Sequence, residues 1–123
     1  MTTFTHAIPI LRSFDETKAK AFYRDYLGFT VDWEHRFEPE LPLYMQVSRG
    51  GLTLHISEHH GDGTPGSCIF VETSGLRDFH AELAAKGYRN LRPGIEEVPW
   101  QSWCMSVIDP FGNTIRFNER KPA

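Results

Sequence analysis

The chain has 123 residues, the size of one domain with a single core. Its 13 Lys and Arg residues against 16 Asp and Glu residues give a net charge of −3, which offers nucleic acid no basic surface. The opening MTTFTHAIPI lacks the basic region and apolar run of a signal peptide, and no stretch approaches the ~18 apolar residues of a membrane span. We therefore expect a cytoplasmic protein without nucleic-acid or membrane partners, with Cys68 and Cys104 reduced.

The first half of the chain has the pattern of a strand, a helix and three further strands. Alternation of apolar and polar residues predicts strands over 4–11, 29–37, 43–48 and 52–57. Ser13 and Glu16 have the spacing of a capping box, and apolar residues at helical spacing predict a helix that ends at Gly28. Pro9 lacks an N–H, which favours an edge position, a bulge or a hinge. Alternation in the second strand places four side chains on one face: Val31, Trp33, His35 and Phe37.

The second half repeats the same order of elements. We predict a strand over 67–72, a helix over 76–86, an irregular stretch over 89–98 with at most a short strand, and a hairpin with strands 103–108 and 114–119. Trp103 is expected on the core face of this hairpin. At an offset of 61 residues, Arg116 matches His55 and Ser67 matches His6. One βαβββ half cannot cover both faces of its sheet, so the two halves, about 3–58 and 66–119, must pack together.

The paired βαβββ pattern with its D-P-x-G-N turn at residues 109–113 resembles the glyoxalase/bleomycin-resistance/dioxygenase superfamily, also called vicinal oxygen chelate proteins. Within it, the segments HAIPIL, FYRDYLGF and LTLHIS are most similar to the bleomycin-resistance proteins. The resemblance implies a single α+β domain, 1–123. Its two tandem βαβββ modules would form a curled mixed β-sheet around a cavity, with the helices on the outer face.

The resemblance also indicates where a metal would lie. Catalytic members hold their metal at positions that match His6, His55, Ser67 and Arg116. A divalent metal needs three protein ligands with open positions for substrate, whereas Ser67 is a poor ligand and Arg116 brings a fixed positive charge. We therefore expect no metal centre, no cofactor and no catalytic residues. The alternative is a metal-dependent lyase, isomerase, epimerase or dioxygenase that uses His6 and His55 with a further ligand such as Glu58.

Aromatic side chains indicate a binding site. Trp33 and Trp100 match positions at which bleomycin-resistance proteins sandwich the planar bithiazole of the drug, and Phe37 lies close to Trp33 in sequence. An aromatic ring exposed in a cleft gives a large contact area at little cost in rotamer entropy. Together with His55 and Arg116 on the expected cavity face, these are the predicted ligand-binding residues.

The resemblance implies a protein that binds and sequesters a bleomycin-type antibiotic, and so confers resistance, without catalysing a reaction. Such proteins are homodimers with two grooves at the subunit interface. Pro9 matches a proline beside an exchanged N-terminal arm, which implies a swapped first strand. Four acidic residues near Trp33 fit a cationic ligand: Asp32, Glu34, Glu38 and Glu40. A cellular metabolite as the natural ligand is a further alternative.

Overall fold

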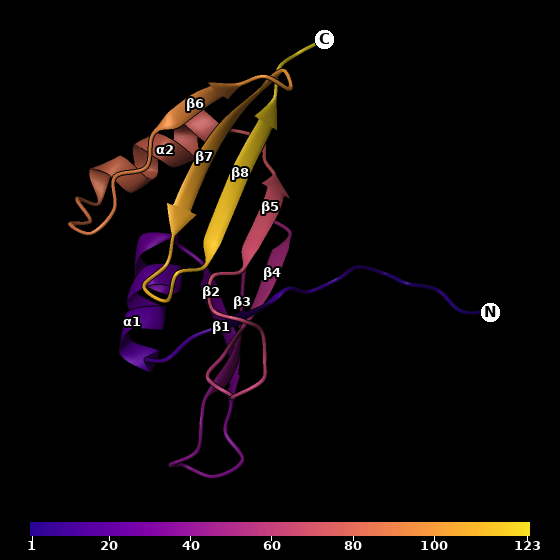
Figure 1. Ribbon diagram of the computed structural model, residues 1–123, viewed down its shortest axis with the longest axis vertical. Coiled ribbons are helices and arrows are strands. Elements are labelled where there is room, and N and C mark those ends of the chain that lie inside the picture. The colour runs from indigo at the N-terminus through magenta and orange to yellow at the C-terminus, as the bar shows by residue number, and fades with distance from the viewer.

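The computed structural model describes all residues, 1–123, and contains two four-stranded mixed sheets (Figure 1). Sheet A consists of β1 (Ile10–Arg12), β2 (Thr30–His35), β3 (Tyr44–Arg49) and β4 (Leu52–Ser57). Sheet B consists of β5 (Cys68–Glu72), β6 (Ile95–Val98), β7 (Ser102–Ile108) and β8 (Thr114–Arg120). The orders β1-β4-β3-β2 and β5-β8-β7-β6 are the same, with one parallel pair in each sheet. The predicted α+β fold of two tandem modules is confirmed.

The first helix begins with α1 (Glu16–Lys20) and continues as the π-helical η1 (Ala21–Tyr26). The side chain of Asp15 caps α1, since it accepts a hydrogen bond of 2.9 Å from the backbone N–H of Lys18. The predicted capping box on Ser13 is therefore wrong, because Ser13 is buried and extends the strand. No helix of the chain is long and apolar enough to cross a membrane.

One core of 18 buried side chains joins the two modules. The strands contribute alternate residues, such as Met45 and Val47 of β3 and Met105 and Val107 of β7, all fully buried. Both α1 and α2 (Leu76–Ala85) lie on the left in Figure 1. One face of each sheet thus packs against the helices and forms the core, while the opposite face is open.

The first nine residues, which we call the N-terminal arm, do not form the predicted strand. The parallel pairing with β4 begins at Ile10, which lies opposite His55. Residues 4–9 are in no strand, so the prediction of a strand from residue 4 is wrong. The arm runs away from the body of the molecule (Figure 1), and Phe4 is 93% exposed.

A β-bulge in β2 places Val31 and Trp33 on opposite faces of sheet A. Val31 lies opposite Val47, a core residue, whereas Trp33 lies opposite Gln46, so Asp32 is the extra residue of a β-bulge. The prediction that Val31 and Trp33 share a face is therefore wrong. Val31 packs against the core, and Trp33 stands on the open face of sheet A.

A buried hydrogen-bond network links the turn between β7 and β8 to the first module. The Asp109 carboxylate accepts hydrogen bonds of 2.8 Å from the backbone N–H groups of Phe111 and Asn113, and one of 2.6 Å from the Tyr23 hydroxyl. The Asn113 side chain donates to Asp109 and to the backbone carbonyl of Arg12, both at 2.8 Å. Burial, followed by the nearby carboxylate, raises the pKa of Tyr23 well above its ordinary value, so the phenol stays a donor.

We predict that Tyr23→Phe lowers the free energy of unfolding by about 2 kcal/mol, because a buried hydrogen bond to a charged group is lost. Urea unfolding at a fixed protein concentration measures this loss. Tyr26→Phe, at another buried tyrosine, is the control and should cost about 0.5 kcal/mol or less. Equal effects of the two substitutions would contradict the role of the network.

Candidate functional site

An aromatic cluster lies on the open face of sheet A. The ring of Trp33 is nearly parallel to that of Tyr44, at 8° with 5.9 Å between centroids. His55 meets both rings edge to face, at 5.3 Å from Trp33 and 5.1 Å from Tyr44. Trp33 remains 42% exposed, so the cluster presents an aromatic surface to a ligand.

A chain of hydrogen bonds fixes the rings of this cluster. The Gln46 amide donates to the Asp32 carboxylate at 3.0 Å, which leaves the Gln46 carbonyl oxygen to accept from His55 Nε2 at 3.0 Å. His55 Nδ1 then has the lone pair that accepts from the Tyr44 hydroxyl at 2.7 Å. Burial lowers the pKa of His55, which favours this neutral form. Burial, with a smaller contribution from Asp62, raises the pKa of Tyr44 and keeps its hydroxyl a donor.

Further rings extend the cluster toward the loop that follows β2. Phe37 is 74% exposed and contacts His35 and His59 edge to face, at centroid distances of 4.8 and 6.1 Å. His59 in turn lies 6.3 Å from Tyr44. Phe37, a predicted site residue, thus belongs to the same aromatic surface as Trp33. We call this surface the sheet A surface, and its rings are those of Trp33, His35, Phe37, Tyr44, His55 and His59.

The open face of sheet B has its own exposed tryptophan. Trp100, on the turn between β6 and β7, is 55% exposed and donates from its indole nitrogen to Asn118 at 3.0 Å. A cavity of about 360 Å³ lies on one side of the ring, lined among others by Ser106 and Arg116. A second, of about 380 Å³, lies between Trp100 and Phe70. We call this region the sheet B surface.

The five predicted ligand-binding residues therefore fall into two groups. Trp33, Phe37 and His55 belong to the sheet A surface, whereas Trp100 and Arg116 belong to the sheet B surface. The cavity beside Trp100 and Arg116 has no residue of sheet A in its lining. Each surface is open to solvent within a single chain.

The candidate metal ligands are not brought together within one chain. His6 lies in the exposed N-terminal arm, while both ring nitrogens of His55 are engaged in hydrogen bonds. The Glu58 carboxylate accepts from the backbone N–H of Leu43 at 2.9 Å. No group of three or more His, Cys, Asp or Glu side chains is placed to hold a metal ion. A metal on His55 Nδ1 would have to displace the Tyr44 hydroxyl.

Among the residues of these surfaces that sequence reasoning missed are Tyr44, Gln46 and Phe70. Tyr44 and Gln46 alternate with the core residues Met45 and Val47 in β3, so the alternation already placed them on the face of His55. Phe70 is opposite Arg116 in the register of β5 with β8. The strand pattern carried the signal, but only the sheet pairing shows which side chains meet.

Two βαβββ modules that share one core and leave one face of each sheet open define a paired-module α+β protein. The chain belongs to the glyoxalase superfamily, because the family model described as glyoxalase superfamily protein matches residues 1–123. A search of curated proteins gave no match.

Solved structures of several other proteins have the same fold. A bleomycin-binding protein complexed with bleomycin has a TM-score of 0.71 and 25% identity, with 96% of this chain and 100% of that chain covered. For a bleomycin resistance determinant encoded on the transposon Tn5, the TM-score is 0.73 and the identity 21%, with 97% and 100% covered. An antibiotic binding protein from Streptomyces sp. CB03234, TnmS3, has a TM-score of 0.69 and 18% identity, with 98% and 100% covered.

The state of His55 predicts a pH dependence of stability. Its pKa is lowered in the folded protein, so the unfolded chain binds the proton more readily, and stability falls as the pH drops below the unfolded value of about 6.5. His55→Gln removes this group. We expect the difference in free energy of unfolding between the protein and this variant to decrease from about pH 7.5 to about pH 5. Urea unfolding over this range measures it, and a difference that grows toward acid would contradict the neutral, hydrogen-bonded His55.

Proposed function

We propose that this protein binds and sequesters a planar, cationic small molecule of the bleomycin type and catalyses no reaction. The observation that carries the proposal is the sheet A surface, where Trp33 is held by its neighbours and half exposed on an open sheet face. A ring fixed in this way stacks on a planar ligand with little further loss of entropy. The structural likeness to a protein complexed with bleomycin, at 25% identity, supports the same ligand class.

The charge beside Trp33 supports a cationic ligand. Hydrogen bonds from Gln46 and then Ser48 lower the pKa of Asp32, so this carboxylate is ionised on the open face. Glu38 and Glu40 are exposed in the loop after β2. A cation attached to a stacked ring would therefore meet negative charge at this end of the site.

Exposed surface supports a homodimer as the functional unit. The single chain exposes 7817 Å², whereas a folded monomer of 14.1 kDa exposes about 6,700 Å². The excess of about 1,100 Å² is comparable to the ~800 Å² that each partner buries in a standard interface. We propose that the sheet A surface of one protomer and the sheet B surface of its partner face each other and form a groove. Trp33 and Trp100 would then hold the ligand from its two sides.

The N-terminal arm supports an exchange between the two protomers. The arm precedes β1 and belongs to no strand of its own chain, and it carries the exposed Phe4. We propose that this arm adds to a sheet of the partner, with Pro9 at the hinge, because the carbonyl of Pro9 still accepts from His55 N at 3.0 Å. The proposed role is antibiotic resistance in the cytoplasm.

Titration of chelator-treated protein with metal-free bleomycin, followed by tryptophan fluorescence, tests the ligand class. We expect saturation at micromolar drug or below, with about one equivalent per chain. Trp33→Ala and Trp100→Ala should each weaken binding about tenfold or more, because stacking on one aromatic ring is worth about 1–3 kcal/mol. Trp103→Phe is the matched control, since Trp103 packs against the core beneath Arg77 and Lys121. No response up to about 1 mM drug would reject the bleomycin-type ligand and direct the search to metabolites.

Sedimentation equilibrium at micromolar concentration tests the dimer. We expect a mass of twice 14.1 kDa for the full chain. The dimer of a chain without residues 1–9 should have a larger dissociation constant than the dimer of the full chain, because the exchanged contacts are lost. A monomeric full chain would overturn the groove between protomers, and an equally stable truncated dimer would overturn the exchange alone.

A further inference from the structure

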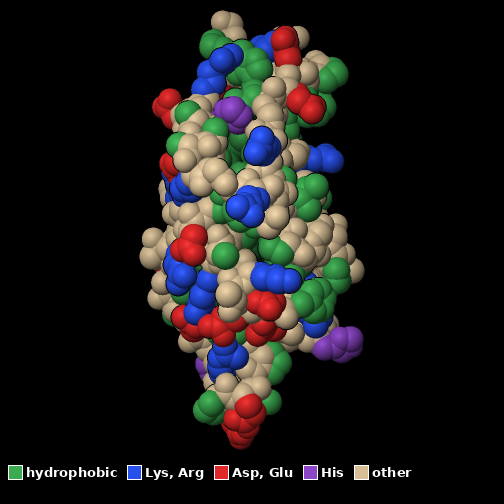
Figure 2. Space-filling model, turned by 90° about the vertical axis from the view of Figure 1, so that its left-hand side faces the viewer, with side chains coloured by type: hydrophobic (Ala, Val, Ile, Leu, Met, Phe, Trp, Pro, Cys, Tyr) green, Lys and Arg blue, Asp and Glu red, His purple; other side chains and the backbone are tan.

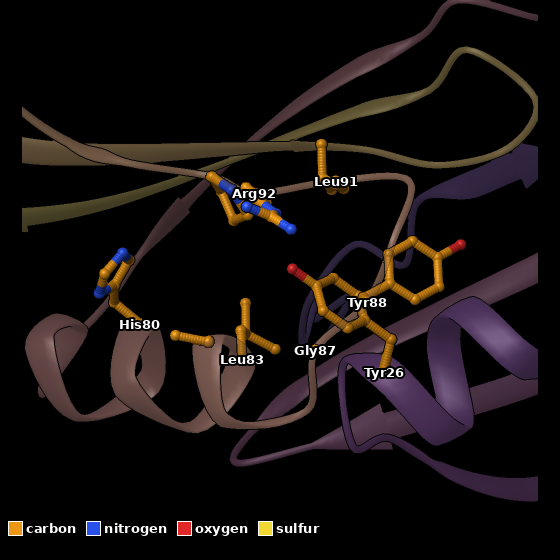
Figure 3. A pocket seen from close by; sticks show the side chains of 9 residues that line it. Tyr26, His80, Leu83, Gly87, Tyr88, Leu91 and Arg92 are labelled. Carbon is orange, nitrogen blue, oxygen red and sulfur yellow. The ribbon is translucent and has the colours of Figure 1, made fainter.

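A separate hollow lies on the helix side of sheet B, between α2 and the loop that leads to β6. Its volume is about 290 Å³. It exists because the two modules differ in length here: β2 begins two residues after Gly28, whereas β6 begins eight residues after Gly87. Three residues of this additional chain, Leu91, Arg92 and Pro93, form the upper wall of the hollow (Figure 3).

Apolar and aromatic groups form the body of this hollow. Leu83 of α2 is buried at its floor, and Leu91 lies on the opposite wall (Figure 3). Tyr26 and Tyr88 close one end with stacked rings, 4.4 Å between centroids and 26° between planes. Phe29, which follows Gly28 as Tyr88 follows Gly87, is instead buried in the core. The walls therefore suit a small ring or a branched alkyl group.

Arg92 is the one charged side chain in the lining of the hollow. Arg92 and His80 are in the lining, which contains no carboxylate. None of the eight ion pairs of the chain involves Arg92. Its guanidinium group points into the space between α2 and the loop, on the side of the stacked tyrosines (Figure 3). Figure 2 faces this side of the molecule and shows a His ring and Lys or Arg side chains in the middle of its upper half, with Asp and Glu side chains toward the edges.

We propose that this hollow is a second ligand site, which takes a small organic anion: a carboxylate on an aromatic or branched apolar body. The guanidinium fork of Arg92 would hold the carboxylate through two parallel hydrogen bonds, and a hydroxyl of the stacked tyrosines would donate a third. The apolar body would lie over Leu83, against the stacked tyrosines. The site is on the helix side, so it is independent of the groove proposed for the cationic drug.

Protein NMR with phenylacetate as the probe tests this site. We expect saturable shifts of the backbone amides of Gly87 and Leu91, with no shift of the Trp33 and Trp100 indoles. Arg92→Gln should weaken binding about tenfold or more, because a charge-assisted pair is lost. Arg89→Gln is the matched control, since Arg89 is exposed in the same loop and outside the lining. Equal affinities of the two variants would overturn the proposal.

Two probes with the unaltered protein make the test independent of any variant. Phenylacetamide has the same body without the charge, and acetate has the charge without the body. We expect both to bind at least about tenfold more weakly than phenylacetate. Acetate binding as tightly as phenylacetate would show a nonspecific anion effect and overturn the proposal. Shifts confined to the indoles would do the same, and neither result would bear on the binding of bleomycin at the sheet surfaces.

Discussion

The structure depends on one constraint: a single core has to serve two sheets. The helices and the alternate apolar residues of the strands cover one face of each sheet, and no element of the chain covers the other. The hydrogen bonds of Asp109 with Tyr23 and Asn113 tie the modules together at this core. Because the modules are held in this way, the two open faces are fixed in position, and their tryptophans remain available to a ligand or to a second chain.

The sheet A surface gives His55 a structural role. One ring nitrogen of His55 donates to Gln46, and the other accepts from the Tyr44 hydroxyl. The same bonds fix the Trp33 cluster, so the histidine acts here as a positioning residue for the aromatic rings. At the matching position of sheet B, Arg116 lies beside Trp100 and adds a fixed positive charge to the open face.

Much of this arrangement could be predicted from alternation in the sequence, because in a strand with one buried face the apolar residues show which side chains point to the core and which to the open face. His55 and Arg116 were placed on the open faces in this way. Alternation gave the wrong face for one residue, because a bulge at Asp32 adds one residue and moves Trp33 to the other face. Bulges leave no reliable mark in a single sequence. The N-terminal arm has the alternating pattern of a strand. A strand also needs a neighbouring strand, and the sequence pattern does not show that the arm has none. The hollow beside Arg92 depends on how an irregular loop packs, which periodicity does not describe.

The central claim is that Trp33 and Trp100 contact the ligand while Trp103 serves the core. The chain has three tryptophans, so incorporation of 5-fluorotryptophan gives one fluorine resonance for each, assigned by single substitution. Addition of metal-free bleomycin should shift the resonances of Trp33 and Trp100 to saturation and leave that of Trp103 in place. Unchanged resonances of Trp33 and Trp100 at saturating drug would contradict a ligand held between the open faces of the two sheets.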